Sequence, residues 1–225
     1  MDNYNYHKGM NGIIQELKCL LKTKSIGTDS DRALLLDFQA ALETKPEKAI
    51  KLEKDALAQI ENITADNARL VSNLHANLGG LYRMNAHPDL AREHMEKSIS
   101  LLDQFNLLHI NDSIPQIANY AMFLTEQQEP ERGISELQKL SGIIKEYHSD
   151  DCLDYAKVQE TLRTIYLMTA NLPQAKTHFK RAFKIYEKIW ADEPEMIEAK
   201  YQEIQELYPQ IGFCIGKNLS GLLTK

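Results

Sequence analysis

Apolar and small residues recur along this chain with two superimposed spacings. Over short stretches they fall three, four or seven positions apart, as in Ala91, Ser98, Leu102 and Phe105. This spacing places them on one face of an α-helix. Similar arrangements return 42 residues before and after this stretch, so the sequence predicts a series of repeated helical units.

Proline gives the clearest measure of the repeat. Pro46, Pro88 and Pro130 are evenly spaced 42 residues apart, and Pro173 is displaced from the next position by one residue. Several further columns hold small or apolar residues in all four units, namely Ala49/Ala91/Gly133/Ala175, Ala56/Ser98/Leu140/Ala182 and Leu36/Leu78/Tyr120/Leu162. Columns that persist through four units indicate a repeat array rather than a chance pattern.

Each unit is predicted to be a pair of antiparallel helices. Its proline suits the first turn of the second helix, where a backbone N–H donor is not required. The segment before the proline is short and polar, as in 84–87, which is typical of a tight connection between antiparallel helices. One hairpin cannot bury both of its apolar faces, so we expect neighbouring hairpins to stack.

These patterns predict the organisation of the whole chain. A first helix is expected near 10–23, hairpins at about 29–62, 66–104, 112–147 and 151–190, and a final pair near 194–208 and 212–223. We therefore expect an N-terminal tail and capping helix over 1–28, four repeat hairpins over 29–190 and a C-terminal capping helix pair over 191–225.

The pattern Leu78-Gly79-x-x-Tyr82, followed by Ala91, Met95 and Ser98, resembles the tetratricopeptide repeat (TPR). The 42-residue period is similar to the longer variant known from kinesin light chains. Segment 76–82 matches the Asn-Asn-Leu-Ala-x-Leu-Tyr core of that variant, with Ala76 in place of the first Asn. The resemblance implies an all-α fold, a right-handed α-solenoid of antiparallel helix hairpins with capping helices. The cargo of kinesin light chains is not carried over, because their Leu-Gly-x-x-His-Pro loop is absent.

In the TPR family the inner helices line a concave groove that binds a peptide or a helix of a partner. The resemblance carries this role to residues in three successive units, namely Asn73, Asn77 and Arg83, then Asn119, Met122 and Glu126, then Lys157, Thr161 and Thr164. Asn can donate and accept hydrogen bonds, which suits a peptide backbone, and Met adapts to irregular apolar partners. The alternative for Asn77 and Asn119 is ordinary exposure or a bond to a neighbouring helix. The mixed charge of the groove favours neither a strongly acidic nor a strongly basic ligand.

Composition and charge exclude several functional classes. The 225 residues include 29 Leu but only two Val, which favours helices over strands. The net charge of −6 gives no electrostatic reason to bind nucleic acid, and no apolar run is long enough to cross a bilayer. The three cysteines form no CxxC pair, and the N-terminus lacks an apolar secretion signal. We therefore expect a cytoplasmic protein without a nucleic-acid or membrane partner.

Candidate chemistry is sparse. The cluster His148-Ser149-Asp150-Asp151-Cys152 contains potential metal ligands and a conceivable nucleophile with its base. A Ser or Asp in such a loop is, however, the usual N-cap of the helix that follows. Gly79-Gly80 lies within a predicted helix, where close packing explains it better than phosphate binding. We therefore expect no catalytic residue, no cofactor and no metal.

The predicted function is a non-enzymatic scaffold or adaptor that binds a peptide or helix of a partner protein on the concave groove. Two alternatives stay open, a peptide-sensing regulatory module and a self-associating structural module. The apolar, glycine-containing stretch 211–223 either caps the array or mediates a homodimer.

Overall fold

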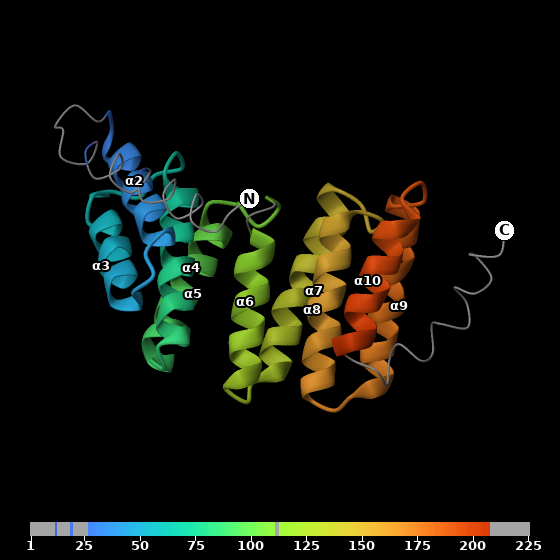
Figure 1. Cartoon of the computed structure of the whole chain (residues 1–225). Coiled ribbons are helices and arrows are strands. Elements are labelled where there is room, and N and C mark those ends of the chain that lie inside the picture. Colours follow the sequence, from blue (N-terminus) through green and yellow to red (C-terminus); the bar gives the residue numbers. More distant parts are fainter. Residues whose placement is uncertain (1–11, 13–18, 20–26, 111–112, 208–225) are drawn as a thin grey trace. The chain divides into compact units, whose positions relative to one another are not determined.

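A computed structural model describes residues 27–110 and 113–207, together with Gly12 and Cys19 (Figure 1). The regular elements in this part of the chain are α-helices. The chain divides into two compact units, Met1–Phe123 and Leu124–Lys225. Apart from Gly12 and Cys19, the helix expected near 10–23 lies outside the described residues, and so does the stretch 211–223.

The first unit contains two complete helical hairpins and most of a further helix. Its hairpins pair α2 (Asp29–Ala41) with α3 (Pro46–Leu57) and α4 (Ala68–Met84) with α5 (Pro88–Gln104). Helix α3 also packs against α4, so the hairpins are in contact. Helix α6 (Ser113–Glu126) follows and crosses the division between the units. These helices fall within the ranges expected from the 42-residue period.

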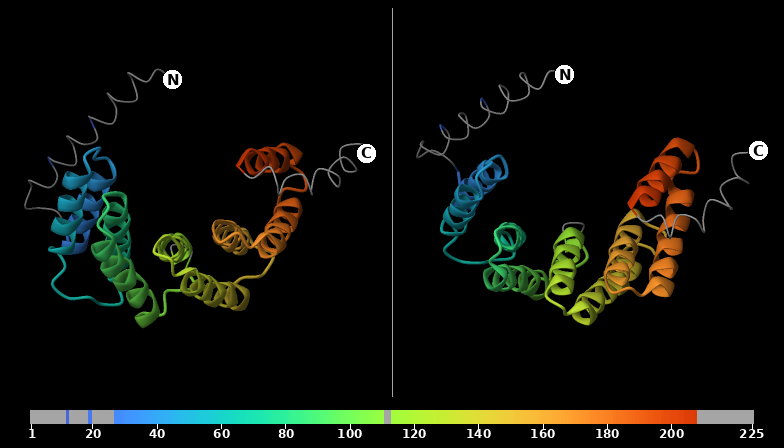
Figure 2. Two further views of the ribbon diagram at one scale, coloured as in Figure 1. Left: turned by 90° about the horizontal axis from the view of Figure 1, so that it is seen from below. Right: turned by 60° about the horizontal axis from the view of Figure 1, so that its bottom comes forward.

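The second unit continues the same pattern. It contains α7 (Pro130–Tyr147), α8 (Leu153–Met168), α9 (Leu172–Ile189) and α10 (Pro194–Leu207). Helix α8 packs against both α7 and α9, and Figure 2 shows α8 and α9 side by side. None of the described helices in either unit combines the length and apolar character of a membrane span.

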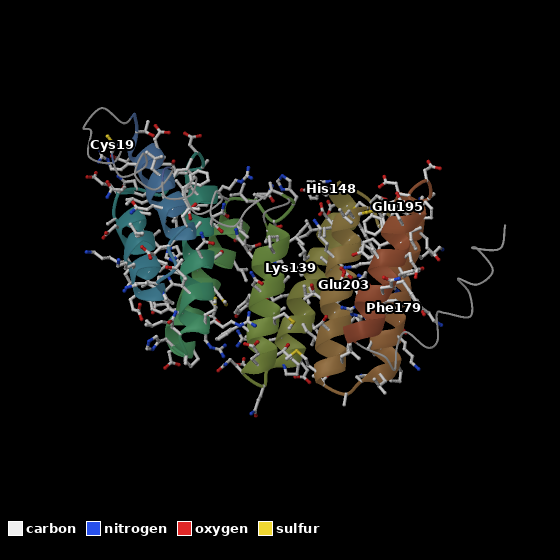
Figure 3. The ribbon with its side chains drawn as sticks, viewed as in Figure 1. Cys19, Lys139, His148, Phe179, Glu195 and Glu203 are labelled. Carbon is white, nitrogen blue, oxygen red and sulfur yellow. The ribbon has the colours of Figure 1, made fainter. Side chains whose placement is uncertain are left out.

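Helix α10 packs onto the last hairpin. Its Tyr201 is buried in a cluster with Ala175, Phe179 and Phe183 of α9, and Phe183 meets the Tyr201 ring edge-on at a centroid distance of 6.4 Å. Figure 3 labels Phe179, which belongs to α9. The apolar surface of α9 that faces α10 is therefore covered within the second unit.

The connection inside three of the hairpins has the same backbone conformation. Ala86, Gln128 and Ala170 have positive φ angles of 56°, 64° and 58°, and they are spaced 42 residues apart. The next backbone N–H in each case donates back to a carbonyl of the preceding helix, as from His87 to Tyr82 at 3.0 Å. This is the left-handed turn that commonly ends an α-helix. The helix after the turn then starts with proline at its first or second position.

Small residues allow the paired helices to approach closely. The column predicted from the sequence, Ala49/Ala91/Gly133/Ala175, is buried in every hairpin. Gly79 of α4 is closer still to its partner helix, because a Cβ atom there would lie 2.5 Å from the Met95 Cγ of α5. Real Cβ atoms do not approach other atoms so closely, so any larger residue here would force Met95 or α5 to move.

Candidate functional site

Helix α6 is tied to the second hairpin by a buried polar network. Gln116 of α6 donates a hydrogen bond from Nε2 to Asn73 Oδ1 of α4. Its Oε1 accepts hydrogen bonds from Ser72 at 2.8 Å and from Ser98 at 2.6 Å. Gln116 therefore bonds to α4 and α5 together, and Asn73 is held in place next to α6.

Asn77 ties α4 to the first hairpin. Its Nδ2 donates to Asp37 Oδ1 of α2 at 2.9 Å and to Glu53 Oε1 of α3 at 3.2 Å. One amide nitrogen carries two hydrogens, so it can serve both acceptors. Asn77 thus bonds to neighbouring helices, which was the alternative considered for this residue. Asn73 and Asn77 together show that α2, α4 and α6 present one connected face in the first unit.

Two adjoining hollows open on this face, which we call the inner-helix face. The first has a volume of about 290 Å³ and is lined by Ala40, Ala41, Glu53, Ala76, Asn77, Gly80, Leu81, Met84 and Asn119. The second has a volume of about 340 Å³ and is lined by Asp37, Asn73, Ala76, Asn77, Pro115, Gln116 and Asn119. The two hollows share Ala76, Asn77 and Asn119 in their lining, so they adjoin each other.

Glu53 is the unusual group at this site. The residue is only 2% exposed, and no N–H or hydroxyl donor among the described residues bonds to its Oε2. Burial raises the pKa of Glu53 to about 9, and the neighbouring charge of Asp37 raises it further. Burial also raises the pKa of Asp37. At neutral pH the two carboxyl groups therefore hold a proton between them.

The repeat shows that Glu53 occupies a core position. The equivalent residues at successive intervals of 42 are Met95, Leu137 and Phe179. All three are buried, with at most 4% of each side chain exposed. By the same count Asp37 is equivalent to Gly79, the residue that packs against Met95. Two carboxyl groups in the first hairpin thus replace a close apolar contact in the second.

Asp37 and Glu53 were not predicted from the sequence as site residues. They are the charged residues that line the two hollows in the described part of the first unit, and both are acidic. The lining of these two hollows is acidic, whereas the mixed charge expected of the groove concerned positions along three units, such as Arg83 and Lys157. The signal that could have identified Glu53 is its place in a column that otherwise holds large apolar residues.

The predicted groove residues of the first two units separate into two groups. Asn73, Asn77 and Asn119 come together around the second hollow. Arg83 is half-buried in the last turn of α4, and Met122 is half-buried on α6. Glu126 is exposed at the end of α6. None of these last three residues lines either hollow.

The predicted residues of the third unit lie along α8. The hydroxyl of Thr161 donates to the carbonyl of Lys157 at 3.1 Å, and that of Thr164 donates to the carbonyl of Glu160 at 3.0 Å. Lys157 forms an ion pair with Asp154 at 3.2 Å. The polar groups of these three residues are therefore engaged within their own helix.

Glu160 of α8 is covered by α10. Its Oε1 lies 3.0 Å from Lys200 Nζ, and its Oε2 accepts a hydrogen bond from the Tyr186 hydroxyl at 2.7 Å. The same Lys200 ammonium lies 5.6 Å from the centroid of the Tyr186 ring. In the second unit, a carboxylate on the first helix of a hairpin is thus neutralised by a lysine from another element.

The loop that contains the candidate nucleophile folds as a helix start. Cys152, rather than the expected Ser or Asp, is the N-cap of α8, and its Sγ accepts a hydrogen bond from the Tyr155 backbone N–H at 3.4 Å. Asp151 forms an ion pair with Lys188. His148, labelled in Figure 3, is the C-cap of α7. His148 therefore ends α7, and Cys152 begins α8.

Two histidines in the helix pairs are held in their neutral form. His75 Nδ1 lies 2.8 Å from His94 Nδ1, and His178 Nδ1 lies 2.8 Å from Gln159 Oε1. Burial lowers the pKa of His75 to about 4, and the adjacent His94 lowers it further. Burial likewise lowers the pKa of His178 to about 4.

We expect the protein to be most stable between about pH 6 and 7. Below pH 6.5 the unfolded chain protonates His75 and His178 but the folded chain does not, so stability falls as the pH approaches 4. From pH 4.5 to about 9 the unfolded chain ionises Glu53 while the folded chain retains the proton. Stability therefore falls again above neutral pH, by up to ~1.4 kcal/mol per pH unit for one proton.

Thermal unfolding followed by circular dichroism between pH 4 and 9.5 measures this dependence. The Glu53→Gln variant is the control, because it should lose the alkaline decrease and keep the acidic one. An unfolding temperature that is constant or rising from pH 7 to 9 in the unaltered protein would contradict the assignment of a shared proton.

The comparisons with known proteins establish the fold. No family model and no curated protein matches this sequence. Among solved structures, BtubC (BKLC) from P. vanneervenii is 16% identical, with a TM-score of 0.71 over 96% of this chain and 90% of that chain. A kinesin light chain candidate with nearly identical TPR-like repeats, from Podosopora anserina, is 12% identical, with a TM-score of 0.67 over 83% of this chain and 91% of that chain.

A third similar structure is MamA, with 16% identity and a TM-score of 0.56 over 84% of this chain and 96% of that chain. At these identities the similarity shows the fold alone. The chain has an all-α fold of TPR-type helical hairpins, so the fold class predicted from the 42-residue period is confirmed.

Proposed function

We propose that this chain is a non-enzymatic protein-interaction scaffold that binds a segment of a partner protein on the inner-helix face. The observation that carries the proposal is the pair of adjoining hollows across α2, α4 and α6. Asn119 lines both hollows, is exposed, and makes no hydrogen bond with a described residue. Its amide is available to donate to and accept from the backbone of an extended segment.

The architecture supports this proposal. Stacked helical hairpins present a preformed surface, so the scaffold loses little conformational entropy when a partner binds. The first hollow is lined by the amide residues Asn77 and Asn119 and also by the apolar residues Leu81 and Met84. This combination suits a peptide, whose backbone is polar and whose side chains alternate in character. Three cysteines without a CxxC pair fit a reducing compartment, and we place the scaffold in the cytoplasm.

Site-specific photo-crosslinking tests the proposal. A photoreactive p-benzoyl-phenylalanine is placed at Asn119 and, as a matched control, at exposed Lys51 on the outer helix α3. In lysate of the source cell we expect adducts to one partner at position 119, in roughly tenfold excess over position 51, because only position 119 lines the hollows. The adduct is mapped by mass spectrometry to a partner segment.

A synthetic peptide with the mapped sequence provides the second half of the test. It should compete with adduct formation at position 119 and leave background labelling at position 51 unchanged. Equal labelling at the two positions, or adducts that the peptide does not displace, would show that the inner-helix face is not the binding surface.

A further inference from the structure

The inner-helix face contains two acidic groups without a cationic partner. We propose that Asp37 and Glu53 bind the ammonium or guanidinium group of a lysine or arginine in the segment that docks on this face. This inference rests on the proposed function and deepens it, because it specifies one side chain that the partner segment must contain.

The first support is a buried carboxyl group that lines a hollow. Glu53 is 98% buried, since 2% of its side chain is exposed, and yet it lines the hollow of about 290 Å³. Its Oε2 accepts no hydrogen bond from an N–H or hydroxyl group of the described residues, and the Glu53 carboxyl group is hydrogen-bonded to that of Asp37 through the shared proton. Among the described residues this buried carboxyl pair is neutralised only by the proton that it shares, and a cation that enters the hollow can take the place of that proton.

The second support is charge. No lysine or arginine of the described residues forms an ion pair with Asp37 or Glu53, and Asn77 supplies one hydrogen bond to each. The nearest lysine in sequence, Lys54, instead lies 5.6 Å from the ring centroid of Tyr82. A carboxylate can accept several hydrogen bonds, so both groups keep capacity for a cationic donor.

The hollow suits an organic cation better than a metal ion. In the described part of the chain, no group of three or more His, Cys, Asp or Glu side chains could hold a metal. Calcium would require six to eight oxygen ligands, whereas an ammonium group donates three hydrogen bonds and a guanidinium donates in parallel pairs. Ala40, Leu81 and Met84 line the hollow and can pack against the methylene groups of a long cationic side chain.

In the second unit, a carboxylate is paired with a lysine of the same chain. There Glu160 receives the ammonium group of Lys200 at 3.0 Å, beside the Tyr186 ring. The carboxylate in that case lies on the first helix of a hairpin, and the lysine arrives from a different element. Asp37 and Glu53 offer the equivalent acceptors on the inner-helix face.

Binding of the cation should release a proton. Without it, the carboxyl pair holds the proton described above, and a cation takes over its neutralising role. The groups that face the pair are the amides of Asn77 on α4 and Asn119 on α6, which do not titrate, so Asp37 and Glu53 are the titrating groups of the two hollows. Affinity for a lysine peptide should therefore rise between pH 6 and pH 8.

Peptide selection tests the inference on the intact chain. A random ten-residue library displayed on phage is selected against the unaltered protein and against the double variant Asp37→Asn/Glu53→Gln. The matched control is Glu47→Gln/Asp55→Asn, which removes two exposed carboxylates from α3. We expect peptides selected by the unaltered protein and by the control to be enriched in lysine or arginine at one position. Peptides selected by the double variant should show no such enrichment.

Affinities of one selected peptide complete the test. Replacing its lysine by norleucine should weaken binding to the unaltered protein at least about tenfold and leave binding to the double variant unchanged. Glu53→Met should also lose the preference, and since we expect this variant to be more stable, unfolding cannot explain the loss. Peptides selected without a basic residue would overturn this inference and leave the proposed function standing. Selection of no peptide at all would overturn both.

Discussion

Replacing Glu53 by methionine should increase the free energy of unfolding by about 1–4 kcal/mol. Methionine is the residue at the equivalent position of the next hairpin, where Met95 is buried with 4% of its side chain exposed. The substitution removes a buried carboxyl group that must keep a proton at neutral pH, and it leaves Asn77 bonded to Asp37 at 2.9 Å. Urea denaturation of the variant and of the unaltered protein measures the difference.

The reverse exchange provides the control for this prediction. Met95→Glu places a carboxyl group beside Gly79, which has no side chain with which to share a proton or a hydrogen bond. This variant should lose several kcal/mol, on the order of 3–5, because it buries an unpaired polar group. A Glu53→Met variant less stable than the unaltered protein would show that the carboxyl pair contributes net stability to the first hairpin.

Gly79→Ala should destabilise the protein by about 1–3 kcal/mol, although alanine is the better helix former. The added Cβ would lie 2.5 Å from Met95 Cγ, 3.2 Å from the Met95 backbone nitrogen and 3.3 Å from the Ala91 carbonyl oxygen. The methionine side chain can move, but the two backbone atoms belong to α5 and can move only with that helix. The contact between α4 and α5 must therefore loosen.

The adjacent glycine is a matched control for this substitution. Gly80 lies in the same helix, and a Cβ there would meet nothing within 4 Å. Gly80→Ala should therefore stabilise the protein, by up to about 1 kcal/mol, through helix propensity alone. Thermal and urea unfolding of the two variants should give shifts of opposite sign. Shifts of the same sign would mean that helix propensity, and not the α4–α5 contact, decides the effect at Gly79.

The two substitutions concern one contact, between two repeat positions, that is seen in two hairpins. Gly79 and Met95 form a tight apolar contact, and Asp37 and Glu53 replace it with a polar pair. If Glu53→Met is more stable but no longer prefers basic peptides, the first hairpin keeps its carboxyl group at the expense of stability. Natural proteins commonly accept such a loss at sites that bind or react.

The sequence predicted the fold well because the fold depends on the size and polarity of buried columns. Ala49, Ala91, Gly133 and Ala175 are all buried, and the prolines start the second helix of each hairpin at its first or second position. These features persist although the signature of the resembled family is partly replaced, as at Ala76. Physical periodicity therefore detects a repeat that no family model matches.

The candidate site was predicted only in part, because its important groups interrupt the repeat. Asn73, Asn77 and Asn119 lie where the helical register places them. Glu53 is visible only as an exception to its column, and its partner Asp37 comes from a different helix. The hydrogen bonds of Asn77 depend on a residue 40 positions earlier, which periodicity does not specify.

The left-handed turns indicate where one module of this chain ends and the next begins. Ala86, Gln128 and Ala170 keep a strict interval of 42 residues, whereas the proline moves to the second helical position before Ala175. Recombination of repeats should therefore be cut at the turns and not at the prolines. A cassette of residues 87–128 would carry the bond from Ser98 to Gln116 within a single transplantable segment. Such a cassette would transfer α5 and α6 together, so the hydrogen bond between them would be kept.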